Sequence, residues 1–154
     1  MEKLASMLKR VRWVSVIGLL LFIIIIAFLI MQIPTGYSVQ GDVGVGVSAD
    51  PSTVKIGERS TIDIEVKNMN KDREVIVYVE AKTYDDQFLF TNTGDKYASK
   101  RDIIVGPKES RKLSFEVRPL TDALPGKYRI DVKAREKSYA EGAEDTVYVK
   151  VVKD

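Results

Sequence analysis

Two neighbouring carboxylates, Asp85 and Asp86, are the residues of this 154-residue chain whose types and spacing come nearest to a chemical site. Asp95 and Asp102 follow them along the chain. Carboxylates that fold together can bind calcium or serve as acid and base in glycoside hydrolysis. The spacing fits no EF-hand loop, so it favours a solvated turn. A calcium-stabilised loop at Asp85 and Asp86 remains the alternative interpretation.

The rest of the composition argues against catalysis. The chain contains no histidine and no cysteine, so it lacks the usual base of a catalytic triad and the main ligands of zinc. A second acidic stretch, with Glu141, Glu144 and Asp145, also favours a solvated loop. No glycine-rich phosphate-binding motif occurs. We therefore expect a protein that is not an enzyme and that uses no cofactor and no metal.

One stretch suggests a binding partner. Around residues 75–79 apolar side chains occupy both alternating sets of a strand, and aromatic residues follow at 84–90. One face must pack in a core, while the other would present its side chains outward, as interfaces often do. The alternative is that a loop or the core covers them. The candidate partner-binding residues are Ile76, Tyr78, Phe88 and Phe90.

The segments that must position these residues alternate apolar and charged side chains with a period of two, which is typical of half-buried strands. Clear examples span 60–68, 73–84, 111–119, 126–134 and 145–152, and weaker ones span 42–50, 86–90 and 101–105. The expected inward sets are Ile62, Ile64 and Val66; Val75, Val77, Val79 and Ala81; Leu113, Phe115 and Val117; Tyr128, Ile130, Val132 and Ala134; and Val147, Val149 and Val151. This pattern predicts an all-β fold, an immunoglobulin-like antiparallel β-sandwich of seven or eight strands over residues 43–154.

The first of these segments, GDVGVGVSAD (41–50), contains two glycines on one side. Gly44 and Gly46 leave that side bare, so another backbone could approach closely. We expect this segment to be an edge strand of the sandwich, with pairing to a neighbouring subunit as the alternative.

Residues 13–33 carry no charge and are long enough to cross a bilayer as one helix. The run exceeds the apolar core of a signal peptide, and no Ala-x-Ala cleavage pattern follows it. It therefore predicts a permanent single-pass transmembrane anchor, joined by a tether at 34–42 to the domain. Residues along the anchor are Trp13, Gly18, Phe22, Phe28 and Ile33.

The flanks of the anchor predict its orientation. Residues 1–12 contain Lys3, Lys9, Arg10 and Arg12, and basic residues near a helix end stay in the cytoplasm. We expect a cytoplasmic head at 1–12 and an extracytoplasmic domain at 43–154. The head carries a net charge of about +3 and the whole chain +2, which leaves about −1 on the rest. The near-neutral domain is therefore not expected to bind nucleic acid. Scarce Asn and Gln with many charged residues indicate a thermophilic, archaeal source.

Two stretches carry a family resemblance. PSTVKIGERSTIDIEVKN (51–68) contains a V-x-x-G-E turn before a strand that ends in Asn, and LPGKYRIDVKA (124–134) contains a G-x-Y-x-I-x-V strand. This layout resembles the immunoglobulin-like modules of prokaryotic surface proteins called CARDB and NEW3 domains. The matching residues are Val54, Gly57, Glu58 and Asn68, and Gly126, Tyr128, Ile130 and Val132.

The resemblance implies structure more than function. Tyr128 is expected either to form a tyrosine corner, with its hydroxyl bonded to backbone upstream, or to be a plain core residue. A binding or spacer module is the implied role. The architecture is also similar, more distantly, to that of archaellum stator subunits, which have one N-terminal helix and a β-sandwich.

Together these features predict a membrane-anchored binding or structural subunit that docks onto a membrane complex, an appendage base or a surface layer. Its expected partners are the lipid bilayer and other membrane or surface-layer proteins, with a homo-oligomer as a further option. The alternative is a filament subunit of type IV pilin style, although KRVRW (9–13) matches a pilin cleavage site only loosely.

Overall fold

The structure is a computed structural model that describes residues 37–153. The predicted head (1–12), the anchor (13–33, with Trp13, Gly18, Phe22, Phe28 and Ile33) and the start of the tether lie outside the described residues. Within residues 37–153, no helix is long and apolar enough to cross a membrane.

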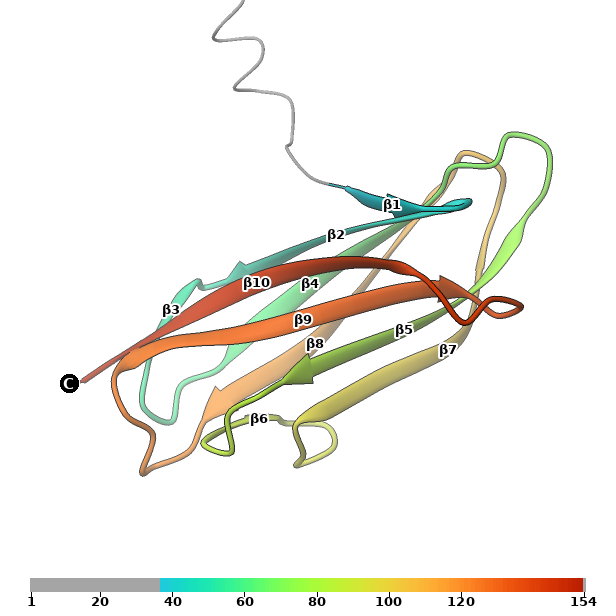
Figure 1. The fold of residues 1–154 in the computed structure, drawn as a ribbon. Helices are drawn as coiled ribbons and strands as arrows, with labels where there is room; N and C mark the ends of the chain where they lie inside the picture. The colour runs from blue at the N-terminus through green and yellow to red at the C-terminus, as the bar shows by residue number, and fades with distance from the viewer. Residues whose placement is uncertain (1–36, 154) are drawn as a thin grey trace, which may run out of the picture. The chain divides into compact units, whose positions relative to one another are not determined.

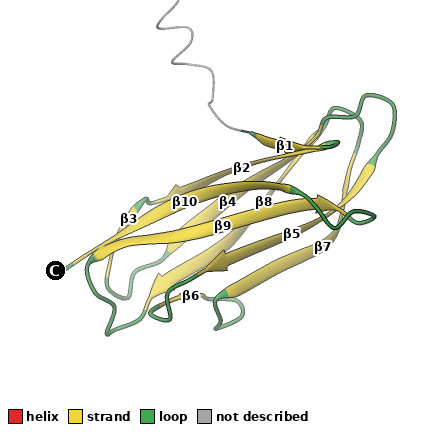
Figure 2. Ribbon diagram, viewed as in Figure 1, coloured by secondary structure: helices red, strands yellow, loops and turns green. Residues whose placement is uncertain are grey.

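The described chain forms ten strands in two sheets (Figures 1 and 2). The first sheet has the order β1-β2-β4-β8-β6 and the second the order β3-β10-β9-β5-β7. Neighbouring strands are antiparallel, except that β3 runs parallel to β10. The strands are β1 (Ser38–Gln40), β2 (Val43–Asp50), β3 (Thr53–Lys55), β4 (Ser60–Asn68), β5 (Val75–Thr83), β6 (Phe88–Phe90), β7 (Tyr97–Val105), β8 (Ser110–Pro119), β9 (Gly126–Glu136) and β10 (Ala143–Val152).

One hydrophobic core fills the space between the two sheets. Buried side chains from both sheets form a single cluster, and each fully buried Val or Ile contributes about 1.5–3 kcal/mol relative to exposure. The predicted inward sets are confirmed for β4, β5 and β9, whose members are all buried. In β8 and β10 the two outermost members, Leu113 and Val147, are only partly buried at the margin of the core.

Two three-residue strands, β1 and β3, were not predicted, because they are too short to show a period. The first half of β7 was missed as well, since the prediction covered only 101–105. The expectation that 42–50 forms an edge strand is wrong at its start, because β1 pairs there and opposes Val39 to Gly44. A Cβ placed on Gly44 would lie 3.6–3.7 Å from side-chain atoms of Met69, Val39 and Tyr37, so this chain itself occupies the close approach that the glycine allows.

The V-x-x-G-E turn has a local physical cause. Gly57 lies at φ +85°, in the left-handed region that favours glycine. Its neighbour Glu58 closes the turn, because its N–H donates to the Lys55 carbonyl (3.1 Å) and its carboxylate accepts from the Lys55 N–H (2.9 Å). Val54 before the turn is buried. The motif therefore shapes the connection between β3 and β4.

The tyrosine corner at Tyr128 is confirmed. Its hydroxyl donates to the Leu124 carbonyl at 2.6 Å, and its ring stacks on Phe88 with centroids 5.0 Å apart. Burial raises the pKa of the phenol. This contact fixes the β8–β9 connection and joins β9 of the second sheet to β6 of the first.

Replacing Tyr128 with Phe is expected to lower the free energy of unfolding by about 1 kcal/mol, because the hydrogen bond is lost and the ring is kept. Urea denaturation of the full chain in detergent, followed by circular dichroism, measures the change. Tyr139→Phe is the matched control, since Tyr139 is exposed, and its effect should stay within about 0.5 kcal/mol. Equal losses in the two variants would contradict the corner.

Candidate docking surface

Two of the four predicted partner-binding residues do not face outward. Phe88 and Phe90 are fully buried, so the prediction is wrong for them. The reason is topological: β6 does not extend the sheet of β5 but joins the first sheet beside β8, where Phe90 opposes Val117. Both rings then point into the core, and Phe90 meets Phe115 edge-on at 6.0 Å.

The other two predicted residues lie on the solvent side of the second sheet, which we call the outer face. Ile76 is 36% exposed and pairs across the strands with Ile104 of β7. Tyr78 is partly exposed on the same side of β5. The large exposed side chains of the outer face are Ile76, Tyr84, Tyr97, Ile104 and Tyr148.

Tyr78 is the centre of one hollow on the outer face. The guanidinium carbons of Arg101 and Arg135 lie 5.0 and 4.8 Å from its ring centroid. Arg135 sits on β9 directly opposite Tyr78, and Arg101 comes from β7 on the other side. The hollow has a volume of about 430 Å³ and is also lined by Glu80, Asp102 and Lys137.

A second hollow, of about 410 Å³, lies along the same strands on the far side of Tyr78 and Glu80. Its exposed rings are Tyr84 and Tyr97, and the Lys82 ammonium lies 4.5 and 5.3 Å from their centroids. Such cation–π contacts hold a lysine and two rings in a defined arrangement. At exposed rings each such contact contributes about 0.5–1 kcal/mol, so it favours this arrangement.

Asp131 fixes the Tyr84 ring. The Tyr84 hydroxyl donates to this carboxylate, which raises the pKa of the phenol. Burial alone would raise the pKa of Asp131, yet donors from Arg129, Thr146 and Tyr84 outweigh it and hold that pKa below its ordinary value. Arg129 and Thr146 each approach Asp131 at 2.7 Å. The carboxylate is therefore occupied and serves to position the ring.

Sequence reasoning missed several residues of the outer face. A usable signal existed for some of them, because Tyr148 and Arg135 alternate with the correctly predicted inward residues of β10 and β9. No such signal existed for Arg101, since the register between β5 and β7 shifts between Val77 and Val79.

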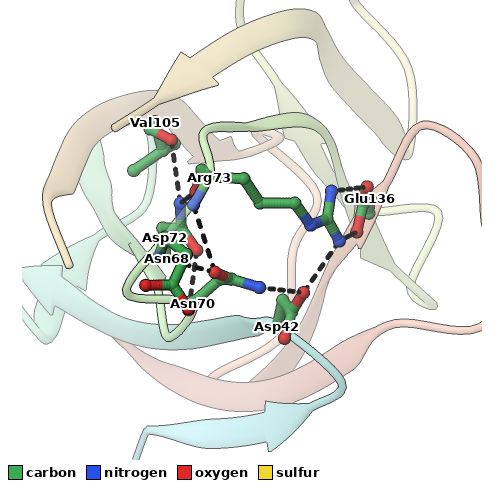
Figure 3. Close-up of polar contacts among 7 residues, drawn as sticks. All are labelled: Asp42, Asn68, Asn70, Asp72, Arg73, Val105 and Glu136. Atoms are coloured by element: carbon green, nitrogen blue, oxygen red, sulfur yellow. Dashed lines mark hydrogen bonds and ion pairs between the residues drawn. The ribbon is translucent and has the colours of Figure 1, made fainter. Parts of the chain in front are cut away.

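A polar network closes the end of the sandwich nearest the first hollow (Figure 3). The buried Asn68 amide donates to the carbonyls of Arg73 (2.8 Å) and Val105 (3.1 Å). Its oxygen accepts from the Asn70 N–H at 2.9 Å, and the Asn70 side-chain oxygen accepts from the N–H groups of Asp72 and Arg73. The loop between β4 and β5 is thus ordered from a single buried side chain.

Arg73 connects this loop to two other elements. Its guanidinium forms a two-bonded pair with Glu136 at the end of β9 (2.7 and 3.0 Å) and reaches Asp42 in the β1–β2 turn at 2.7 Å. The Glu136 side chain is only 11% exposed. Asn70 and Arg73 together hold the pKa of the Asp42 carboxyl below its ordinary value, and the two carboxylates raise the pKa of Arg73.

Three of the acidic residues singled out in the sequence form hydrogen bonds or ion pairs within this chain. Asp85 accepts from the Gln87 N–H in its own turn (2.9 Å), and Asp86 pairs with Lys96 at 2.6 Å. Glu141 accepts from Gln40. In the described part of the chain, no group of three or more Asp, Glu, His or Cys side chains could hold a metal ion.

Comparison with known proteins identifies the fold. No protein-family model matches the chain, and no curated protein matches it. The crystal structure of the CARDB domain of the PF1109 protein from Pyrococcus furiosus, in complex with di-metal ions, is 23% identical with a TM-score of 0.55, covering 72% of this chain and 88% of that one. The solution NMR structure of that domain is 25% identical with a TM-score of 0.52, covering 72% and 94%.

A more distant match has the same kind of sandwich inside a much larger protein. A fragment of Escherichia coli alpha-2-macroglobulin is 14% identical with a TM-score of 0.57, covering 77% of this chain and 17% of that one. The described residues therefore form a CARDB-like β-sandwich, as the sequence motifs indicated. The di-metal ions are a feature of the Pyrococcus crystal structure.

Replacing Asn68 with Ala is expected to lower the free energy of unfolding by about 2–4 kcal/mol, because two carbonyls and one N–H lose their partner in a buried place. Guanidinium denaturation of the full chain measures this loss. Asn92→Ala, at an exposed turn position, should change stability by less than about 0.5 kcal/mol. A shift as small as that for Asn68→Ala would contradict the role of the network.

Replacing Asp42 with Asn is expected to flatten the acid side of the stability profile. The folded-state pKa of Asp42 is lowered, so its contribution is complete above the unfolded pKa and is lost as the pH falls through the folded pKa. The thermal midpoint of the wild type should therefore fall more steeply below about pH 4 than that of the variant. Asp63→Asn, on an exposed position of β4, is the control and should keep the wild-type slope.

Proposed function

We propose that this chain is a membrane-anchored, extracytoplasmic binding or structural subunit whose β-sandwich docks onto a protein partner through the outer face. The apolar run at 13–33 and its basic flank support the anchor and the orientation, with the N-terminus in the cytoplasm. The CARDB-like fold of residues 37–153 supports a binding module, although a fold alone does not assign a function.

The observation that carries the proposal is the exposure of several tyrosine side chains on one sheet. Tyr84, Tyr97 and Tyr148 are each more than half exposed. Interfaces are enriched in Tyr and Arg, and the side chains that contribute most to binding are often of these types. The outer face combines both, with cations already placed against the rings.

The proposed role of this surface is non-catalytic. The chain has no histidine or cysteine, and carboxylates of the outer face are used in ion pairs, Asp131 with Arg129 (2.7 Å) and Glu144 with Lys133 (2.9 Å). The partner is a component of a membrane complex, an appendage base or a surface layer. A type IV pilin-like subunit, in which the partner is another copy of the chain, is the second candidate.

Site-specific photocrosslinking tests the docking face. A photoreactive amino acid at Tyr148 should give one discrete adduct in the native membrane, while the same group at Ser114, exposed on the first sheet, should give none. The double variant Tyr84→Ser with Tyr97→Ser should lower the Tyr148 adduct about tenfold or more. Its thermal midpoint should fall only slightly, because both side chains are more than half exposed and lose only surface contacts with Lys82 and Asp131.

Mass spectrometry of the adduct decides between the two candidates. A different membrane or surface protein supports the docking subunit, and a ladder of multiples of this chain supports the filament subunit. No adduct at Tyr148, or equal adducts at Tyr148 and Ser114, would overturn the outer face as the docking surface.

A further inference from the structure

Two arginines on the outer face converge on one tyrosine. Arg101 of β7 and Arg135 of β9 approach the Tyr78 ring from the two strands that flank β5. Arg135 is held further by its Nη1, which donates to the Tyr139 carbonyl at 3.0 Å. The guanidinium groups are therefore placed by the fold before any ligand arrives.

Neither arginine forms an ion pair with a carboxylate of residues 37–153, whereas neighbouring cations do. Lys137 pairs with Asp102 at 2.7 Å, and Lys133 pairs with Glu144 at 2.9 Å. Two cations beside one ring repel each other, and a carboxylate bound next to them reduces that repulsion. The uncompensated charge thus lies on the arginines that line the hollow.

The hollow itself has the size and the donors for a small anionic group. Its volume is about 430 Å³, and Tyr78 lines it together with both arginines. Guanidinium groups that stack on an aromatic ring keep their N–H edges free for the two-bonded recognition of a carboxylate. Glu80 also lines the hollow, which disfavours a multiply charged anion and suits a singly charged one.

An apolar contact lies immediately beside the arginines. Ile76 and Ile104 oppose each other across β5 and β7 and are 36% and 54% exposed. Ile76 precedes Tyr78 by two positions and so lies on the same side of the strand. A ligand in the hollow that belongs to a protein can therefore bury an apolar neighbour at the same time.

We propose that this hollow binds an acidic side chain, Asp or Glu, of the docking partner, and that an apolar partner residue next to it packs on Ile76 and Ile104. The inference rests on the proposed docking function and specifies the chemistry of the partner. Arg101 and Arg135 hold the carboxylate, Tyr78 positions both guanidinium groups, and the isoleucines supply the apolar contact.

Charge reversal in the full chain tests the proposal, with the Tyr148 photoadduct in native membranes as the readout. Arg101→Glu with Arg135→Glu should lower the adduct yield about a hundredfold, because two carboxylates then face the partner's own. Arg101→Gln with Arg135→Gln should lower it less. Lys127→Glu, an exposed β9 residue outside the hollow, is the matched control and should change it by less than about threefold.

A zero-length carbodiimide reagent, which joins an amine to a carboxylate in direct contact, identifies the bound group. With Arg101→Lys, the new amine should become linked to an Asp or Glu of the partner, and peptide mapping should find an apolar residue beside it. An undiminished Tyr148 adduct in the charge-reversed chain would overturn this inference and leave the docking function standing. If the chain without charge reversal gave no Tyr148 adduct, both this inference and the proposed docking function would be overturned.

Anionic lipid is the other source of an oxyanion for this hollow. Phenylglyoxal modifies accessible arginines, so the full chain is treated in nanodiscs of phosphatidylcholine with and without phosphatidylglycerol. Equal modification of Arg101 and Arg135 in the two nanodiscs is expected. Protection by phosphatidylglycerol alone, without any partner protein, would overturn the assignment in favour of a lipid headgroup.

Discussion

The buried amide of Asn68 is the contact on which the loop end of the sandwich depends. Asn68 closes β4 of the first sheet, and its Nδ2 donates to Val105 of β7 in the second sheet and to Arg73 in the connecting loop. Without a disulfide, a two-sheet domain must fix the angle between its sheets by packing and hydrogen bonds. Arg73 in turn forms an ion pair with Glu136, which directly follows Arg135 in the sequence. The same network that joins the sheets therefore positions the arginine hollow of the outer face.

The two sheets present different chemistry to solvent, and this difference supports docking through only one of them. On the first sheet, the paired strands β4 and β8 expose Asp63, Lys112, Ser114 and Glu116, and partly expose Thr61 and Glu65. Such a mixed polar surface is what a solvated sheet requires. The second sheet instead exposes tyrosines and an isoleucine pair. Aromatic side chains of this kind are enriched at protein interfaces, so the proposed docking uses the second sheet.

Periodicity predicts what depends on one strand, and it fails for what depends on strand neighbours. Ile62, Ile130 and Val79 were predicted to face inward because their own strands alternate, and they do. Phe88 and Phe90 were misplaced because nothing local shows that β6 joins the other sheet. The Arg73 pairs are also invisible locally, since Asp42 and Glu136 lie 31 and 63 positions away along the chain. The tyrosine corner at Tyr128 was one of two alternatives that followed from the family resemblance, and its partner Leu124 lies only four positions upstream.

The proposed docking uses side chains and not strand addition, because the long edge strand of the second sheet is irregular. β7 is the long edge strand of that sheet, and a regular exposed edge is a template for pairing with another chain. Its ladder with β5 is interrupted between Val77 and Val79, and Asp102 lies at φ +54°. An irregular edge with Lys100 and Arg101 beside the break resists further pairing. The break also changes the register so that Arg101 reaches the Tyr78 ring. One local irregularity thus both protects the edge and assembles the hollow on the face.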